Sequence, residues 1–292
     1  MEEKSAGFAN FGPMKKTIPA VFISILWLIH PAFAQSLDSI AVVTKNWKTT
    51  SIGKGIVWKH GHFEQLFGSH QDINLVEIDL KKYRKKIRIA ADSVRLDSAS
   101  QMATAHGAVV AINGGFFDMK NGGSVDFVKV DHQVINRTKK PTDRADAVLL
   151  ISGKKTEIRS AASVDYERNK VPNVLLSGPL LMQNGYAVAL AANPFNDNRH
   201  PRSAVAVTAD RKLIFMVVDG RNKHAAGMNL TELTKLLDWL GADDAMNLDG
   251  GGSSTLFVKG ATETGVVNHP SDNKQFDHFG QRPVASIIYV AD

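Results

Sequence analysis

Short runs of apolar or alternating residues recur from Asn74 to the end of the chain, and turn residues separate them. Alternation with a period of two is typical of a half-buried strand, and a short, fully apolar run is typical of a buried one. We therefore predict a mixed α/β (α+β) fold with a central, mostly β sheet and a few helices packed on it. The predicted strands include "NLVEIDL", "KIRIAA", "AVVAINGGFFD", "VDFVKV", "AVLLIS", "AVAVTAD" and "KLIFMVVDGR".

Two helices are predicted from their capping residues. Ser98 and Gln101 form a capping-box pattern that begins one helix, and Gly107 is its expected end. Asn229 and Glu232 form the same pattern for a second helix, whose leucines share one face. With strands on either side, residues 211–252 resemble a βαβ unit, in which ligands gather at the carboxyl ends of the strands. The leucines are Leu230, Leu233, Leu236, Leu237 and Leu240.

The N-terminus has the pattern of a secretory signal peptide. Lys15 and Lys16 precede a mostly apolar stretch over residues 18–29, and Ala32-Phe33-Ala34 matches a cleavage site. The apolar stretch is shorter than the ~20 residues that span a bilayer. We predict that residues 1–34 are removed by cleavage after Ala34, leaving a secreted or periplasmic protein without a stable membrane anchor. The origin of residues 1–13, upstream of this pattern, is left open.

The remaining chain is predicted to form one catalytic domain over residues 71–292, because no Pro/Ser-rich linker or charge block divides it. Residues 35–70 are predicted to be an N-terminal arm or extra strands, with Trp47, Trp58 and Phe63 available for packing. The composition, 43% hydrophobic and 22% charged, is that of a globular protein with a substantial core.

Charge and cysteine content narrow the classes of function. The net charge is +6, or +5 without residues 1–34, which suits an anionic substrate and ordinary solubility equally. The basic run over residues 81–86 lacks interleaved aromatic residues, so we interpret it as a solvated hairpin turn and expect no nucleic-acid partner. Because the chain has no cysteine, it has no disulfide, no thiol nucleophile and no cysteine-linked lipid.

Three predicted strands end in a polar residue followed by glycine. These residues are Asn113, Asp219 and Asp249, the last within "NLDGGGSST". Glycine lets a backbone approach a ligand closely, whereas Asn-Gly and Asp-Gly are also the commonest hairpin signals. The repetition in one domain favours a shared pocket over three unrelated turns.

The glycine run does not match the known nucleotide-binding loops. The P-loop requires Gly-Lys-Ser/Thr, and no lysine lies between Gly250 and Leu256. The dinucleotide fingerprint opens a helix, whereas this run leads into a predicted strand. His200, His224 and His269 show no ligand-type spacing such as His-x-x-x-His, and no cofactor is expected. A divalent cation held by Asp219 and Asp249 is left open, because oxygen ligands leave no compact sequence signature.

Several segments, in order, closely resemble the phosphodiester glycosidase family, the family of N-acetylglucosamine-1-phosphodiester α-N-acetylglucosaminidase, also called the uncovering enzyme. The resemblance covers roughly residues 105–291, and the sequence departs from the family pattern at Ser203 and His269. It implies an exported hydrolase that cleaves a GlcNAc-like sugar from a sugar-1-phosphodiester in a polysaccharide, cell-wall polymer or glycoconjugate. The segments are "AINGGFFD", "SGPLLMQNG", "HPRSAVAVTADRKLIFMVVDGR", "GMNLTELTKLLDWLGADDAMNLDGGGSSTLFV", "VVNHPSD" and "QRPVASIIYV".

The resemblance also implies roles for individual residues. Asp249 is the first candidate for nucleophile or base, and Asp219 is the second. Arginines within the family motifs are expected to grip the phosphate, since guanidinium binds phosphate through two parallel hydrogen bonds. Asparagines at the loop tips are expected to hold the sugar, and the glycine amides to donate to an oxyanion. The predicted substrate-binding residues are Arg202, Arg221, Arg282, Asn113, Gly250, Gly251, Gly252, Ser253 and Asn268.

Two other functions fit the same residues. One is a non-catalytic accessory protein that binds or helps to export an exopolysaccharide. The other is a metal-dependent phosphodiesterase that cuts the phosphorus–oxygen bond. For the glycosidase and for the phosphodiesterase, the predicted partner is an anionic carbohydrate substrate that contains a sugar phosphodiester.

Overall fold

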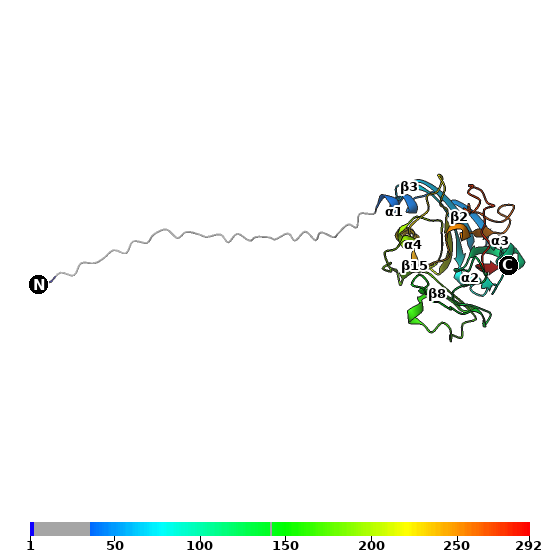
Figure 1. Cartoon of the computed structure of the whole chain (residues 1–292). Coiled ribbons are helices and arrows are strands. Elements are labelled where there is room, and N and C mark those ends of the chain that lie inside the picture. Colours follow the sequence, from blue (N-terminus) through cyan, green and yellow to red (C-terminus); the bar gives the residue numbers. More distant parts are fainter. Residues whose placement is uncertain (3–35, 141) are drawn as a thin grey trace. The chain divides into compact units, whose positions relative to one another are not determined.

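The computed structural model describes residues 1–2, 36–140 and 142–292, and the predicted signal peptide lies, from residue 3 onward, outside the described residues. The described residues from Ser36 to the C-terminus form one compact unit (Figure 1). The unit is mostly β, with three sheets and short helices packed on them. The predicted fold class is therefore confirmed, although the strands divide among three sheets.

The largest sheet has eight strands in the order β1-β2-β3-β14-β13-β15-β11-β12. Strand β13 is antiparallel to both β14 and β15, so β14 and β15 run parallel on either side of it. Helix α5 (Leu230–Trp239) connects these two parallel strands, which confirms the predicted βαβ unit. The strands are β1 (Lys48–Gly53), β2 (Ile56–Leu66), β3 (Ser69–Asp79), β11 (Leu180–Gln183), β12 (Tyr186–Ala187), β13 (Arg202–Thr208), β14 (Lys212–Val218) and β15 (Ala242–Asn247).

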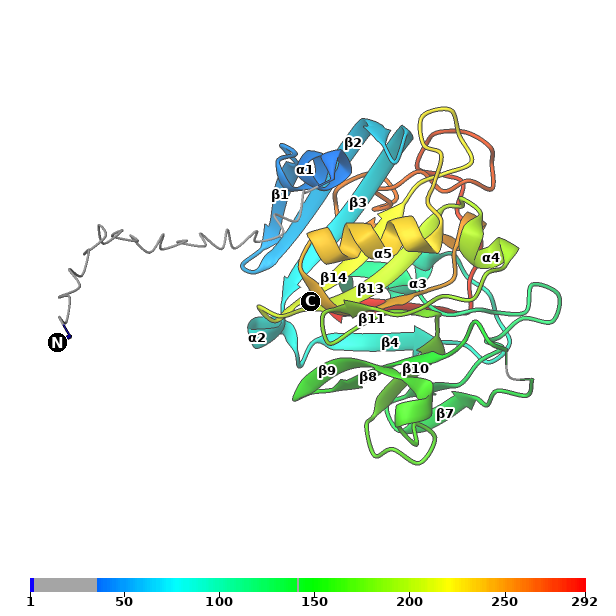
Figure 2. The same cartoon turned by 90° about the vertical axis from the view of Figure 1, so that its left-hand side faces the viewer.

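Helix α5 covers one face of this sheet, with α1 (Leu37–Val43) beside it (Figure 2). Both halves of the predicted capping box are present: the Asn229 side chain accepts from the Glu232 amide, and the Glu232 carboxylate accepts from the Asn229 amide. Four of the predicted leucines pack against the sheet with less than 1% exposure, and Leu240 is partly buried. The apolar stripe of α5 therefore provides one of the two hydrophobic layers on this sheet.

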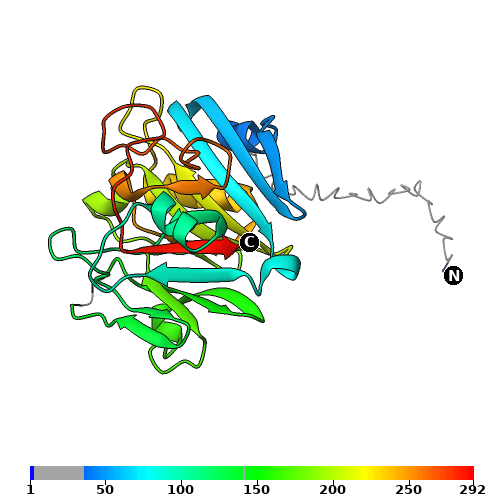
Figure 3. The same cartoon turned by 90° about the vertical axis from the view of Figure 1, so that its right-hand side faces the viewer.

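A four-stranded sheet, in the order β16-β5-β17-β4, packs near the opposite face (Figure 3). Helix α3 (Ala99–Ala105) lies on its outer side and begins with the predicted Ser98–Gln101 capping box. The strands are β4 (Ile87–Ala91), β5 (Ala108–Asn113), β16 (Leu256–Val258) and β17 (Ser286–Ala291).

The third sheet has five strands in the order β7-β6-β10-β8-β9. Side chains from all three sheets meet in one central cluster, which includes Val76, Ile112 and Leu149. This shared core holds the sheets together. The strands are β6 (Val128–Val130), β7 (Gln133–Asn136), β8 (Ala147–Ser152), β9 (Lys155–Ser160) and β10 (Asn173–Ser177).

Short helical turns complete the unit. Helix α2 (Leu80–Tyr83) overlaps the start of the basic run and connects β3 to β4, which belong to different sheets. The predicted hairpin turn there is therefore wrong: the segment is a crossover between sheets. The other turns are α4 (Pro194–Asp197), the 3₁₀ helix η1 (Ala161–Ser163) and the 3₁₀ helix η2 (Gly251–Ser253). Among the described residues, no helix is long and apolar enough to cross a membrane.

The segment 35–70 contains α1, β1, β2 and the start of β3. Strand β2 pairs along most of its length with β3, and β3 pairs with β14. The segment therefore extends the largest sheet at its edge. Trp47 and Phe63 meet edge to face, with ring centroids 5.5 Å apart.

Replacing Asn229 by alanine should destabilise the unit by about 1 kcal/mol, because the substitution leaves the Glu232 amide without its cap. Urea unfolding of both forms measures the difference. The exposed Asn198, which lies outside any helix, provides the matched control Asn198→Ala. An unchanged midpoint for Asn229→Ala would show that the cap contributes nothing measurable.

Candidate active site

The carboxyl ends of β14 and β15 lie at the same edge of the largest sheet, on either side of the start of β13. Val218 at the carboxyl end of β14 pairs with Arg202 at the start of β13 and with Ile73 near the start of β3. Asn247 at the carboxyl end of β15 pairs with Ala204. The loops after β14 and β15 therefore leave the sheet side by side.

The buried side chain of Asn113 ties this edge to the four-stranded sheet. Its Oδ1 accepts from Ser203 Oγ at 2.7 Å and from the Thr255 amide at 3.1 Å. Its Nδ2 donates to the carbonyl of Asp249 at 2.7 Å, and the Asp249 amide donates to the Gly114 carbonyl. With no solvent exposure, Asn113 fixes the loops instead of facing a ligand.

Asn268 makes a second buried tie. Its Oδ1 accepts from the Leu256 amide, and its Nδ2 donates to the Ser254 carbonyl and to Asp219 Oδ1, the latter two at 3.0 Å. The loop after β14 is thereby joined to the end of the glycine loop. The three predicted strand tips are thus linked by hydrogen bonds, directly or through Asn268, and none of the three is a simple hairpin turn.

Asp249 is half-buried at the start of the glycine loop, and its Oδ1 accepts from the Gly250 amide at 3.0 Å. Burial raises the pKa of Asp249 to about 6, against the opposing influence of the Ser253 hydroxyl and of Arg282 and Arg144. A carboxyl group with such a pKa changes its protonation state near neutral pH, which suits a catalytic base.

Two guanidinium groups lie directly on the glycine run. A Cβ at Gly251 would lie 3.0 Å from Nη2 of Arg221, and a Cβ at Gly252 would overlap the Arg282–Asp272 ion pair. Gly251 also has a φ of 65°, which an L-residue adopts at a cost. Gly251 and Gly252 are therefore required because protein side chains close on this loop, and a Cβ at Gly250 would lie 2.8 Å from the Pro201 carbonyl oxygen. The Gly250 amide donates to Asp249 and the Gly251 amide to the Pro201 carbonyl.

Arg221 has a left-handed backbone, with a φ of 61°. This conformation costs a non-glycine residue about 1–2 kcal/mol and is found often at functional sites. The Arg282 side chain forms a two-bond pair with Asp272, at 2.8 and 2.9 Å, and is about a quarter exposed. Of the two arginines beside the glycine loop, Arg221 is therefore the one with a strained backbone conformation.

Arg202 lies on the helix side of the sheet, two residues before Ala204. It is 1% exposed and donates to the carbonyls of Met228, Phe195 and Asn198. Burial, together with the charge of Arg221, lowers the pKa of Arg202 to about 10. Most of its hydrogen-bonding capacity is thus committed to the loops around the site.

Arg144 is an exposed arginine that the sequence analysis missed. Its guanidinium lies 4.0 Å from the ring centroid of Phe116, and its charge acts on Asp249. Phe116 in turn meets Phe195 edge to face, and Arg144 and Phe195 both line a cleft of about 450 Å³. No motif marks Arg144 in the sequence, since it lies in the polar segment before β8.

Asp219 faces a buried network instead of the glycine loop. It is 1% exposed and accepts from the His269 amide and from His269 Nδ1, each at 3.0 Å. Burial opposes the charged imidazole, but the hydrogen bond to Asp219 and the charges of Asp219 and Asp72 raise the pKa of His269. The ring of Phe276 stacks on His269 with centroids 3.8 Å apart.

Asp72, also missed by the sequence analysis, completes this network. Its carboxylate is bonded to His60 Nε2 and His62 Nδ1 and lies 3.9 Å from His269 Nδ1. Burial alone would raise the pKa of Asp72, but these imidazoles lower it. Among the described residues, the ligand atoms of Asp219 cluster with those of Asp72 and His269, and Asp249 is not in that cluster.

A carboxylate with guanidinium groups beside it, after the carboxyl ends of β14 and β15 on either side of β13, suits an anionic ligand. A family model described as phosphodiester glycosidase matches residues 106–291, more than half of the chain. The chain therefore belongs to the phosphodiester glycosidase family.

Solved structures share the fold. The catalytic domain of zebrafish N-acetylglucosamine-1-phosphodiester alpha-N-acetylglucosaminidase, auto-inhibited by its pro-peptide, has a TM-score of 0.66 at 20% identity, covering 83% of this chain and 85% of that one. A hypothetical protein from Synechocystis has a TM-score of 0.67 at 16% identity, covering 84% and 64%. A putative exported protein from Burkholderia pseudomallei K96243 has a TM-score of 0.54 at 15% identity, covering 76% and 74%.

One curated relative is similar in sequence. The SPbeta prophage-derived uncharacterized protein YomE of Bacillus subtilis (strain 168) is 37% identical over 74 residues. This match covers 25% of the chain and 11% of YomE, so the chain spans about a tenth of that relative's length.

Replacing Asp249 by asparagine should raise the melting temperature at pH 7–8 and leave it almost unchanged near pH 4. The pKa is about 6 in the folded protein, above the ~3.9 of an unfolded chain. Folding therefore favours the neutral acid, and this contribution is lost as pH rises through 6. Thermal unfolding of both forms from pH 4 to 8 measures the difference in melting temperature. The exposed Asp143 provides the control Asp143→Asn. Equal melting temperatures at pH 8 would contradict the raised pKa.

Proposed function

We propose that this protein hydrolyses a sugar-1-phosphodiester, releasing a GlcNAc-like sugar from a glycoconjugate, cell-wall polymer or polysaccharide. The observation that carries the proposal is the position of Asp249, half-buried, with Arg221 and Arg282 lying on the adjoining glycines and the charge of Arg144 acting on it. The Asp249 carboxylate beside guanidinium groups, of which Arg282 is paired with Asp272, matches the charge of such a substrate. Family membership supports the same reaction.

Hydrolysis of a sugar-1-phosphodiester requires few groups besides the Asp249 carboxylate and the guanidinium groups beside it. The bond between the anomeric carbon and the phosphate oxygen breaks, and the phosphate monoester leaves with the bonding electron pair. Because a phosphate monoester is a weak base, it needs less protonation than an alkoxide leaving group. Asp249 acts as nucleophile towards the anomeric carbon, or as the base that takes a proton from the attacking water.

The phosphate is proposed to bind to Arg221, with Arg144 and Arg282 contributing charge. The cleft beside Arg144, about 450 Å³, has the volume of a small-ligand site and is proposed to receive the sugar. Arg202, Asn113 and Asn268 are proposed to hold the loops in place, since their side chains are already engaged with the protein. Asp219 is proposed to orient His269 at the rim.

Export of the protein is part of the proposal. It rests on the signal-peptide pattern over residues 1–34. The structurally similar protein from Burkholderia pseudomallei is itself described as exported. A substrate outside the cytoplasm would fit this location.

Purified protein should release the sugar from a GlcNAc-1-phosphodiester, and Asp249→Asn should lose activity by a factor of about 100–10,000. Run in oxygen-18 water, the reaction should place label in the sugar alone, because carbon–oxygen cleavage adds water to the sugar. Chelator should leave the rate unchanged. Label in the phosphate, with loss of activity in chelator, would instead indicate a metal-dependent phosphodiesterase. Binding without turnover would indicate an accessory protein.

Arg221→Lys should lower kcat/KM by about 10- to 100-fold, because lysine cannot supply two parallel hydrogen bonds to a phosphate. Steady-state kinetics on the same diester measures the effect. Arg168, 91% exposed on another sheet's loop, provides the control Arg168→Lys. If Arg221→Lys has the kinetics of the wild type, Arg221 does not bind the phosphate and its role is structural.

A further inference from the structure

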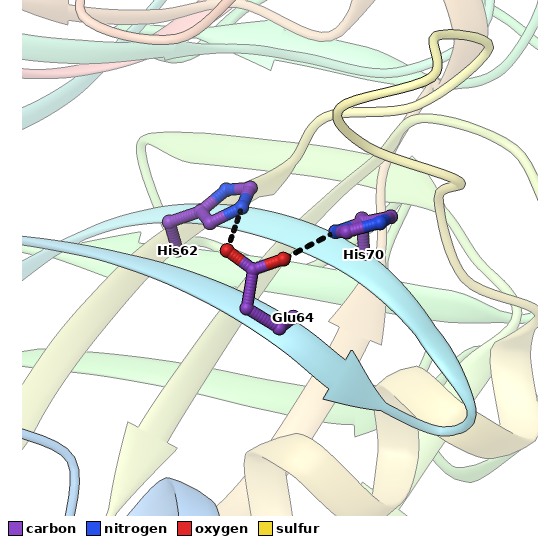
Figure 4. A group of neighbouring side chains, drawn as sticks. All are labelled: His62, Glu64 and His70. Carbon is purple, nitrogen blue, oxygen red and sulfur yellow. Dashed lines mark ion pairs between the residues drawn. The ribbon is translucent and has the colours of Figure 1, made fainter.

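A second group of chemically active side chains lies on the β2–β3 hairpin, outside the residues that the family model matches. His62 and Glu64 lie on β2, and His70 lies on β3. Figure 4 shows Glu64 between the two imidazole rings, with one carboxylate oxygen directed at each. The proposed hydrolysis uses none of these three residues.

The period of the strands brings these side chains to one face. Residues 60, 62 and 64 alternate with Phe63, which packs on the helix side of the sheet. In the same way, residues 70 and 72 alternate with Ile73 on the helix side. His62 pairs directly with Asp72, and an irregularity between Phe63 and Leu66 adjusts the end of the hairpin.

The three side chains have metal-binding geometry. Glu64 Oε1 lies 3.5 Å from His62 Nε2, and Glu64 Oε2 lies 2.9 Å from His70 Nδ1. One ligand atom from each residue lies within 4.8 Å of the others. Two ligands of a tetrahedral zinc ion, each at ~2.1 Å from the metal, lie about 3.4 Å apart, so small side-chain movements would suffice. Two imidazoles and a carboxylate form a ligand set that zinc accepts.

An independent feature orients one ligand. The Asp72 side chain is 4% exposed, and its Oδ2 lies 3.1 Å from His62 Nδ1. An ionised carboxylate can only accept a hydrogen bond, so it holds the proton on Nδ1 and leaves the lone pair on Nε2, the atom that faces Glu64. A carboxylate behind a ligating histidine is the arrangement that orients histidine in zinc sites.

The neighbouring cluster of Asp72, Asp219 and His269 is a poorer metal site. Its carboxylates already accept hydrogen bonds from imidazoles, amides and Asn268, and an ion would have to displace them. His62, Glu64 and His70 are instead accessible, with side chains 35%, 73% and 49% exposed. An ion can therefore enter from solvent, and a fourth position remains for water or a ligand.

We propose that His62, Glu64 and His70 form a binding site for Zn²⁺ or a similar divalent transition metal, with Asp72 as the residue that positions His62. A bound ion joins the two strands at the end of the hairpin. It also connects, through Asp72, to the network that includes His269 and Asp219. The site is separate from the proposed hydrolytic carboxylate, Asp249.

Calorimetric titration of the tag-free, chelator-treated protein with zinc chloride tests the proposal. One equivalent should bind with a micromolar or lower Kd. His70→Ala and Glu64→Gln should each weaken binding at least tenfold, and Asp72→Asn should weaken it about 10- to 100-fold. His132→Asn, on an exposed turn of another sheet, and Asp249→Asn should bind zinc as the wild type does.

X-ray absorption of the zinc-loaded protein should show two imidazole ligands, and His70→Ala should lose one. The proposal is overturned if no zinc binds at a 100-fold excess of zinc over protein. It is also overturned if zinc binds equally tightly to the wild type, His70→Ala and Glu64→Gln. Because this readout needs no substrate, its failure is separate from any failure of the hydrolysis proposal.

Discussion

The buried amide of Asn113 is the interaction on which the rest of the site depends. It bonds to β13 through Ser203, to the glycine loop through the Asp249 carbonyl, and to the chain before β16 through Thr255. A buried amide left without partners would cost about 1–3 kcal/mol per group, so this arrangement strongly favours one relative position of the two sheets. Asp249 is thereby held where the sheets meet.

That placement also explains the electrostatics of Asp249. The carboxyl group is removed from much of the solvent, which raises its pKa to about 6, and nearby guanidinium groups only partly offset this effect. A bound phosphodiester would add negative charge beside it, whereas the arginines would neutralise that charge. The loop therefore combines a destabilised carboxylate with cationic groups, a combination typical of sites that act on anions.

The N-terminal hairpin connects to this site through charge and hydrogen bonds. Asp72 on β3 stands between the imidazoles of the hairpin and His269, which in turn bonds to Asp219 after β14. Residues outside the family match thus contact residues inside it. The hairpin extends the sheet and also carries charged groups to the rim of the site.

Local patterns were sufficient to predict the strands, both capping boxes, the βαβ unit and the three glycine-flanked tips, because each depends on residues near one another in the sequence. The sequence alone could not indicate Arg144, Asp72 or the close approach of Arg221 to Gly251, since these contacts join distant segments. Nor could it show that Asn113 and Asn268 are buried supports or that the basic run crosses between sheets. Burial and long-range pairing decide such roles, and both exist only once the three sheets pack around their common core.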